Sequence, residues 1–470
     1  GILPTAVSLP PAVSLPPTTL LPPFSPELLA SLPGPVQVIN NLVGQGPSQF
    51  TALNAAAPVF NTVLGGIRLP PQQQPLGPTG SQQGQQQQLP VGFDRFFFND
   101  TATTETRFVK DEVVLQIAGN VTVERLEAAV GRLGLTRLAS ENLATTGSTV
   151  VRLRITDGRS PAEIIPALAA IQLVAVVQPN YVYTLQQQPG GLPSPAHDDT
   201  TQGDPAQYIL EKLKIVDVHR MVRGTNVPIA VIDSQIDASH PDLEGVIAKR
   251  FSAVGAEEKP HAHGTGMAGA IAAHQRLLGT APAARLLAVH AFSASATTAE
   301  STTFNILKGI NWSAQEGARI INMSFAGPRD PSLARALKAA YDKGIVLIAA
   351  AGNAGPKSPP LFPGADPYVI AVTATDVDDK LFTGANRGKY ISVAAPGVDI
   401  LVPAPEGGYQ ITTGTSVAAA EVSGIVALLL ERNPKLTPAD IRRILTASAK
   451  RLAPGERDDN FGSGLIDPLQ

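Results

Sequence analysis

The sequence predicts an α/β fold in which helices sandwich a parallel sheet, preceded by a small α+β domain and a disordered N-terminal segment. Three observations support this prediction. The chain has 470 residues, more than one ordinary core needs. Its prolines, 42 in all, concentrate in residues 1–90. The C-terminal half instead alternates short apolar runs with helical phrases.

Residues 1–105 lack an apolar pattern that would bury a core. Pro-rich phrases are followed there by a Gln-rich tract at Gln82–Gln88. Such a composition does not offset the conformational entropy lost on folding, so we expect a disordered segment. Within it, the run Phe96–Glu105 is similar to the translation of a sequencing adapter, and a genuine linker is the alternative. We therefore assign no function to this segment.

Residues 106–185 change to a regular apolar periodicity. The pattern predicts a β-α-β-β-α-β-like order in a small α+β domain, with strands at 112–117, 149–155 and 174–183 and helices at 123–132 and 161–169. Residues 186–204 follow with Gln, Pro, Gly, Ser and Asp and no apolar period. We expect them to form an exposed linker of the kind that proteases cut.

Residues 205–470 carry the predicted parallel sheet. Strands are expected at 227–232, 285–292, 320–324 and 346–350, and helices at 264–273, 302–316 and 331–343. Strands that alternate with helices form parallel sheets covered on both faces. Reactive side chains are then expected beyond the C-terminal ends of the strands.

Composition excludes several classes of function. A net charge of −3 and a pI near 6.2 give no basic surface for nucleic acid or an anionic membrane. The absence of cysteine excludes disulfides, thiolate metal sites and a cysteine nucleophile. The longest apolar stretch, 164–177, is shorter than the ~20 residues of a membrane span, so none is expected. These features suit an exported bacterial protein, whether secreted, periplasmic or on the cell surface.

Three phrases in the C-terminal region contain candidate catalytic residues. Asp233 ends an apolar strand, His263 precedes a run of small residues, and Ser416 opens a long apolar helix. Taken alone, Asp233 is expected to cap a turn and Ser416 to cap a helix. Four other histidines of this region are assigned surface or core roles: His240, His261, His274 and His290.

The order Asp233, His263, Ser416 is one of the known arrangements of a catalytic triad. With their surrounding phrases, these residues resemble the subtilisin-like serine peptidases over residues 204–467. The resemblance implies a subtilisin-like fold and a serine endopeptidase that works through an acyl-enzyme intermediate. In such chemistry His263 takes the Ser416 proton and passes it to the leaving amine, while Asp233 orients the imidazole.

The resemblance also implies further site residues. Asn353, in the phrase Ala349–Gly355, matches the side-chain donor of the oxyanion hole. Two short segments match the walls of the substrate-binding cleft: Ser324, Phe325, Ala326 and Gly327, and Ala350, Ala351 and Gly352.

The end of the α+β domain, 177–183, is similar to the end of the propeptide of these peptidases. This implies a zymogen whose residues 106–185 act as an intramolecular chaperone and inhibitor until the linker is cut, with polypeptides as substrates. A catalytically inactive extracellular binding or surface module is the alternative. An α/β enzyme of another class is disfavoured, because the sequence contains no GxxxxGK and no HExxH phrase.

Five residues depart from the family pattern: Gln235, Gly266, Val417, Ala420 and Glu421. Gln235 stands where glycine is usual, so backbone strain is expected in the turn after Asp233. Glu421, a little over one helical turn beyond Ser416, is expected to alter the pocket floor or the local field.

No cofactor is expected to be needed for catalysis. Asp242 matches one ligand of a structural calcium site found in relatives, but residues 274–279 offer no Asn or Asp. Calcium needs several oxygen ligands, so that site is expected to be absent, while calcium elsewhere stays open.

Overall fold

The computed structural model describes residues 105–186, 203–255, 257–294, 299–455 and 457–470, and the backbone of 96–97 and 188–189. The disorder expected for 1–95 and 98–104 lies outside the described residues. Phe96–Phe97 form β1, which pairs in parallel with β5 (Val174–Leu185).

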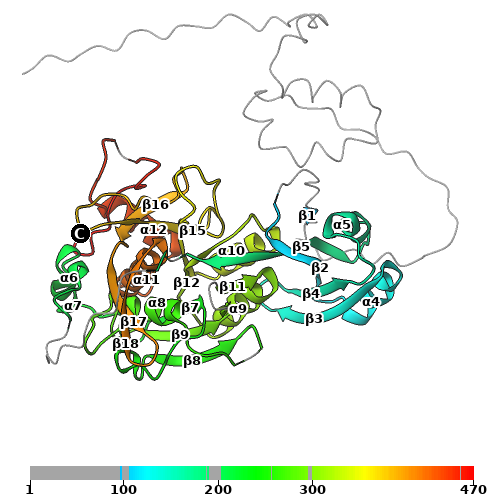
Figure 1. Ribbon diagram of the computed structural model, residues 1–470, viewed down its shortest axis with the longest axis horizontal. Helices are drawn as coiled ribbons and strands as arrows, with labels where there is room; N and C mark the ends of the chain where they lie inside the picture. The colour runs from blue at the N-terminus through cyan, green and yellow to red at the C-terminus, as the bar shows by residue number, and fades with distance from the viewer. Residues whose placement is uncertain are drawn as a thin grey trace, which may run out of the picture. The chain divides into compact units, whose positions relative to one another are not determined.

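A seven-stranded sheet forms the centre of the C-terminal domain (Figure 1). Its order is β16-β15-β14-β12-β7-β9-β8, and its pairings are parallel, as predicted. The strands are β7 (Pro228–Asp233), β8 (Ile247–Ser252), β9 (Arg285–His290), β12 (Ile320–Met323), β14 (Val346–Ala350), β15 (Val369–Thr375) and β16 (Ile391–Pro396).

Helices cover both faces of this sheet because side chains alternate along each strand. Ile229 and Val231 of β7 belong to the core that also contains residues of α8 (Ala262–Ala272) and α11 (Thr415–Arg432). Ala230 and Ile232 belong to the opposite core. That core contains residues of α9 (Thr303–Gln315) and α10 (Pro331–Asp342). The other helices are α6 (Tyr208–Lys212), α7 (Ile215–His219), η4 (Pro241–Leu243) and α12 (Pro438–Ser448).

The α+β domain has the predicted element order. It contains β2 (Phe108–Ala118), α4 (Val123–Val130), η3 (Gly131–Leu133), β3 (Leu135–Leu143), β4 (Ser148–Ile155), α5 (Pro161–Ala169) and β5. Its antiparallel strands lie in the order β5-β2-β4-β3. Val113, Leu115 and Ile117 pack with apolar residues of α4 and α5 into a core of their own.

Strand β5 also pairs with the C-terminal domain. It pairs with β11 (Ala299–Thr302), which pairs with β10 (Ser293–Ala294), and with β13 (Phe325–Ala326), all antiparallel. Two side chains of β5 accept hydrogen bonds from backbone N–H groups at the starts of helices. Asn180 Oδ1 accepts from Phe304 N (3.3 Å), and Gln178 Oε1 accepts from Ser332 N (3.0 Å). The α+β domain therefore binds the first turns of α9 and α10.

A third sheet contains β17 (Ile400–Ala404), β18 (Gly408–Thr413) and β6 (Gln188–Pro189). β6 lies within the predicted linker and pairs antiparallel with Thr412 and Thr413. Within the part of the chain that the structure describes, no helix is long and apolar enough to cross a membrane.

Candidate active site

Asp233 and His263 form a buried pair at the C-terminal edge of the central sheet. Asp233 is the last residue of β7, and His263 lies in the first turn of α8. The imidazole Nδ1 is 2.8 Å from Oδ1 and 2.9 Å from Oδ2 of the carboxylate. An imidazole held this way carries its proton on Nδ1 and presents Nε2 as a base.

Ser234 fixes this pair, and the sequence analysis did not single it out. Its backbone N–H (2.7 Å) and its hydroxyl (3.0 Å) both donate to Asp233 Oδ1. The same hydroxyl accepts from Gly264 N at 3.0 Å. Ser234 therefore ties the end of β7 to the start of α8. Its place directly after the catalytic candidate was the only signal in the sequence.

Ser416 lies in the first turn of α11, as predicted, and is buried. Its Oγ lies within hydrogen-bond distance of two carbonyl oxygens, Gln186 O at 2.5 Å and Ser324 O at 3.0 Å. His263 Nε2 is buried and has no hydrogen-bond partner among the described residues. The hydroxyl is thus engaged with the chain at Gln186 rather than with the imidazole.

The Gln186 carbonyl accepts a second hydrogen bond, from Asn353 Nδ2 at 2.8 Å. The orientation of the Asn353 amide is set by Thr415, whose N–H (3.0 Å) and hydroxyl (2.8 Å) both donate to Asn353 Oδ1. Thr415 is a positioning residue that the sequence analysis missed, although it precedes Ser416 directly.

The chain crosses this site in extended form. Before Gln186, Thr184 and Leu185 pair antiparallel with Ala326 and Phe325. After it, Gln188 and Pro189 pair with Thr413 and Thr412. Gln186 N also donates to Ser324 O at 3.3 Å. The exposure predicted for the linker is wrong at Gln186, which is only 9% exposed.

The segments predicted to line the cleft lie on both sides of the Gln186 backbone. Ser324 and β13 contact it as described, and Gly327 exchanges backbone hydrogen bonds with Phe362. On the other side, Ala350 ends β14 and is followed by Ala351 and Gly352, whose N–H donates to Thr415 Oγ1 at 3.1 Å. The Gln186 side chain accepts from Asn353 N at 2.8 Å.

This geometry agrees with comparisons to known proteins. The model of the subtilase family, Peptidase_S8, matches residues 224–464. The chain belongs to the subtilase family. Subtilisin E of Bacillus subtilis (strain 168) is 36% identical over 275 residues, which cover 55% of this chain and 69% of that protein. Subtilisin of Bacillus pumilus has the same identity over 275 residues, and the match covers 96% of its length.

The crystal structure of fervidolysin from Fervidobacterium pennivorans, described as a keratinolytic enzyme related to subtilisin, has the same fold. It matches with a TM-score of 0.66 at 24% identity, covering 80% of this chain and 62% of that chain. As a subtilase, the present protein is a serine endopeptidase. Subtilases need no cofactor for catalysis.

Two departures from the subtilase pattern fit the structure without strain. Gln235 is not among the described residues with positive φ, so the strain expected there is absent. At Gly266 a Cβ would lie 2.9 Å from Val402 Cγ2 and 3.3 Å from Gln410 Nε2. β17 and β18 thus occupy the space next to the position where a second histidine is common in subtilases.

Glu421 belongs to α11, and its side chain is fully buried in the protein. Neither carboxyl oxygen has a hydrogen-bond partner in the described part of the chain. Burial raises the pKa of this carboxyl well above its ordinary value of 4.5. A neutral carboxylic acid is the form that such a site favours.

Asp242, the residue that matches a calcium ligand in relatives, is buried and contacts the loop at 274–279. Its Oδ1 accepts from Gln275 N (3.0 Å) and Leu277 N (3.1 Å). Arg276, in the same loop, pairs with Asp204 at 2.9 Å and lies over the Tyr409 ring. Amide donors thus engage Oδ1 of Asp242, whereas its buried Oδ2 has no hydrogen-bond partner among the described residues. Across the described ranges, no three His, Cys, Asp or Glu side chains gather to hold a metal.

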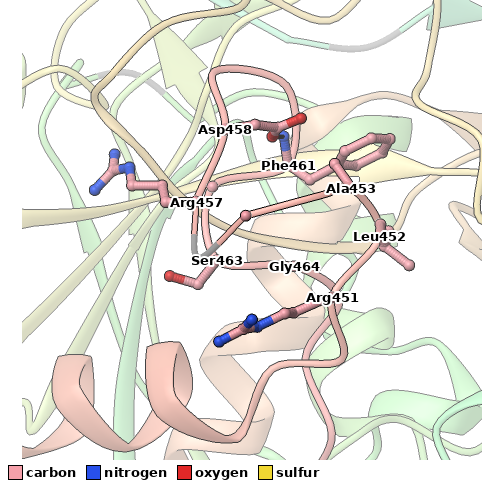
Figure 2. Close-up of a pocket in the computed structure, with 10 residues that line it drawn as sticks. Arg451, Leu452, Ala453, Arg457, Asp458, Phe461, Ser463 and Gly464 are labelled. Carbon is pink, nitrogen blue, oxygen red and sulfur yellow. Dashed lines mark hydrogen bonds between the residues drawn. The ribbon is translucent and has the colours of Figure 1, made fainter.

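Two of the histidines assigned structural roles have clear ones. His240 Nε2 lies 2.9 Å from Gly408 O and its Nδ1 accepts from Asp242 N, while His261 caps α8 by accepting from His263 N. Figure 2 shows a small pocket in the loop 451–464 that contains none of the triad candidates. Arg457 there donates to Ile391 O, and Asp458 accepts from Phe461 N. The first bond ties the loop to β16 and the second closes a turn within the loop, so both are structural.

Proposed function

We propose that this subtilase cleaves peptide bonds with Asp233, His263 and Ser416 as its triad, and that its first substrate is its own precursor. The proposal is supported above all by the Gln186 carbonyl, which accepts hydrogen bonds from both Ser416 Oγ and Asn353 Nδ2. The bond proposed to be cut is the one that follows Gln186.

Each residue has a distinct part in the proposed reaction. Ser416 Oγ attacks the Gln186 carbonyl carbon, and its proton passes to His263 Nε2. The Asn353 amide and the N-terminal end of α11 stabilise the oxyanion that forms. When the C–N bond breaks, His263 gives its proton to the departing amine. A water molecule then releases the acyl group, with His263 as the base.

The α+β domain is proposed to serve as chaperone and inhibitor. Two of its side chains, Asn180 and Gln178, accept hydrogen bonds from N–H groups that would otherwise lack partners at the starts of α9 and α10. Its pairing with β11 and β13 keeps the segment before Gln186 in the cleft after the cut. We further propose that the protein is exported, as a bacterial subtilase acting on external polypeptides.

The proposal is tested by following the intact mass of the refolded full chain over time. The wild type is expected to be cut after Gln186, and Ser416→Ala is expected to stay whole. Ser313→Ala is the matched control, because Ser313 is also buried and helical but bonds only to Gly309 O. It is expected to be cut like the wild type.

The rival is a catalytically inactive binding or surface module. It predicts that the wild type also stays whole and that a serine-directed fluorophosphonate fails to label Ser416. That pair of results would refute the proposed peptidase activity of this chain.

A further inference from the structure

Tyr183 occupies a pocket beside the site. It is the fourth residue back from the bond proposed to be cut, and its side chain is fully buried. Its ring meets Phe325 edge-on, with centroids 5.9 Å apart. A Cβ on Gly327 would lie 2.3 Å from Tyr183 Cδ1, so the ring lies directly against the glycine backbone. The walls of this pocket thus suit an aromatic side chain.

A carboxylate lies at the end of the pocket. Asp330, 1% exposed, caps α10: its Oδ1 accepts from Leu333 N at 2.9 Å. Its Oδ2 accepts from Thr303 Oγ1 at 2.5 Å and from the Tyr183 hydroxyl at 3.1 Å. Gln178 Nε2 donates to Oδ1 at 2.7 Å. The Asp330 carboxylate accepts all four of these hydrogen bonds.

These donors come from two different parts of the chain. Leu333 and Thr303 belong to the peptidase domain, as Asp330 itself does. Tyr183 and Gln178 belong to the α+β domain, and both are lost from the site in processed enzyme from which the cut α+β domain has dissociated. Asp330 Oδ2 then faces an aromatic pocket without the hydrogen bond that the Tyr183 hydroxyl donates. A phenol supplies that donor, whereas a phenylalanine ring would leave a buried carboxylate partly unpaired.

We propose that Asp330 makes this enzyme selective for tyrosine, over phenylalanine, four residues before the cut bond. The inference rests on the proposed function and names its substrate class: polypeptides with a tyrosine at that position. Asp330 acts as a specificity-determining residue by accepting a hydrogen bond from the substrate's phenol.

The test uses processed enzyme obtained from the full chain and two p-nitroanilide peptides, Tyr-Thr-Leu-Gln and Phe-Thr-Leu-Gln, which copy residues 183–186. A hydrogen bond to a charged group predicts a kcat/KM at least about tenfold higher for the tyrosine peptide. Asp330→Ser keeps a capping hydroxyl for α10 but removes the second oxygen. It is expected to bring the ratio of the two kcat/KM values close to one. Thr437→Ala, which removes the cap of α12, is the control and should leave the ratio unchanged.

Gly327→Ala supplies a second test that does not depend on the folding of Asp330→Ser. The added methyl group should abolish the preference for either aromatic peptide over Ala-Thr-Leu-Gln. If the wild-type enzyme cuts casein but has equal kcat/KM values for the tyrosine and phenylalanine peptides, the proposed role of Asp330 is overturned and the proposed function is not. Enzyme that cuts neither casein nor peptide, and is not labelled by a fluorophosphonate, would overturn the proposed function and this inference together.

Discussion

The Asp233–His263 pair and the segment around Gln186 are built in different ways. Asp233 and His263 are 30 residues apart, and each lies at an end of a neighbouring strand or helix. Ser416 and Gln186 are 230 residues apart, and they meet only because β5 pairs with β13 and β6 with β18. The Asp233–His263 pair is therefore placed by local structure, whereas the chain at Gln186 is placed by pairing between segments far apart in the sequence.

The largest expected effect comes from the Asp233–His263 pair. Asp233→Asn should slow self-cleavage of the full chain by about 10⁴-fold, because the imidazole loses the partner that fixes its tautomer. The first-order rate of cleavage, followed by intact mass, measures this change. Asp237→Asn is the matched control, since Asp237 caps a nearby turn through Ser239 and does not contact His263. If Asp233→Asn were cut at the wild-type rate, the role of the pair would be refuted.

A second prediction concerns Glu421, close to Ser416 on the same helix. Its pKa is raised by burial, so the folded state binds its proton more tightly than the unfolded chain does. The stability linked to that proton is complete below about pH 4.5 and is lost as pH rises toward the raised value, by up to about 1.4 kcal/mol per pH unit. In the uncut Ser416→Ala chain, Glu421→Gln should therefore raise the free energy of unfolding by an amount that grows with pH.

Glu431→Gln is the matched control on the same helix. Partial burial acts to raise the pKa of Glu431, but hydrogen bonds from Thr225, Arg223 and Gly224 lower it overall. The stability from this group is present above its ordinary value and is lost as pH falls through the lowered one. Glu431→Gln should therefore destabilise the chain at neutral pH. A pH-independent effect of Glu421→Gln in denaturant unfolding would contradict the account of Glu421.

The smallest expected effect comes from Gln178, which joins the α+β domain to the start of α10. In the uncut Ser416→Ala chain, Gln178→Ala removes the acceptor of Ser332 N and a donor to Asp330, and should cost about 1–2 kcal/mol. Gln116→Leu is the contrast, because neither amide atom of the buried Gln116 has a partner in the described chain. Gln116→Leu should be neutral or stabilising by denaturant unfolding. Equal losses for both variants would show that Gln178 contributes packing alone.

Local patterns predicted much of the fold. The central strands and α8 to α10 lie within a few residues of their predicted positions, because alternation and helical periodicity mark buried faces. β3 was required by the predicted order but had no recognisable range, since most of its residues are partly or fully exposed. An exposed edge strand carries little apolar signal.

Part of the candidate site was also predictable from local sequence. Asp233, His263 and Asn353 could be proposed because each stands in a distinctive short phrase. Gln186 and Asp330 could not, because their roles depend on β5 lying against the peptidase domain. In isolation, a glutamine in a polar linker and an aspartate before a helix have ordinary interpretations.

The most direct test of the central claim is the N-terminal sequence of the larger C-terminal fragment at the earliest time that cleavage is detected. We expect this fragment to begin at Gln187, because the Gln186 carbonyl lies against Ser416 and Asn353. A fragment that begins elsewhere in residues 190–204, or a chain that is never cut, would contradict the claim that the chain at Gln186 is bound as a substrate.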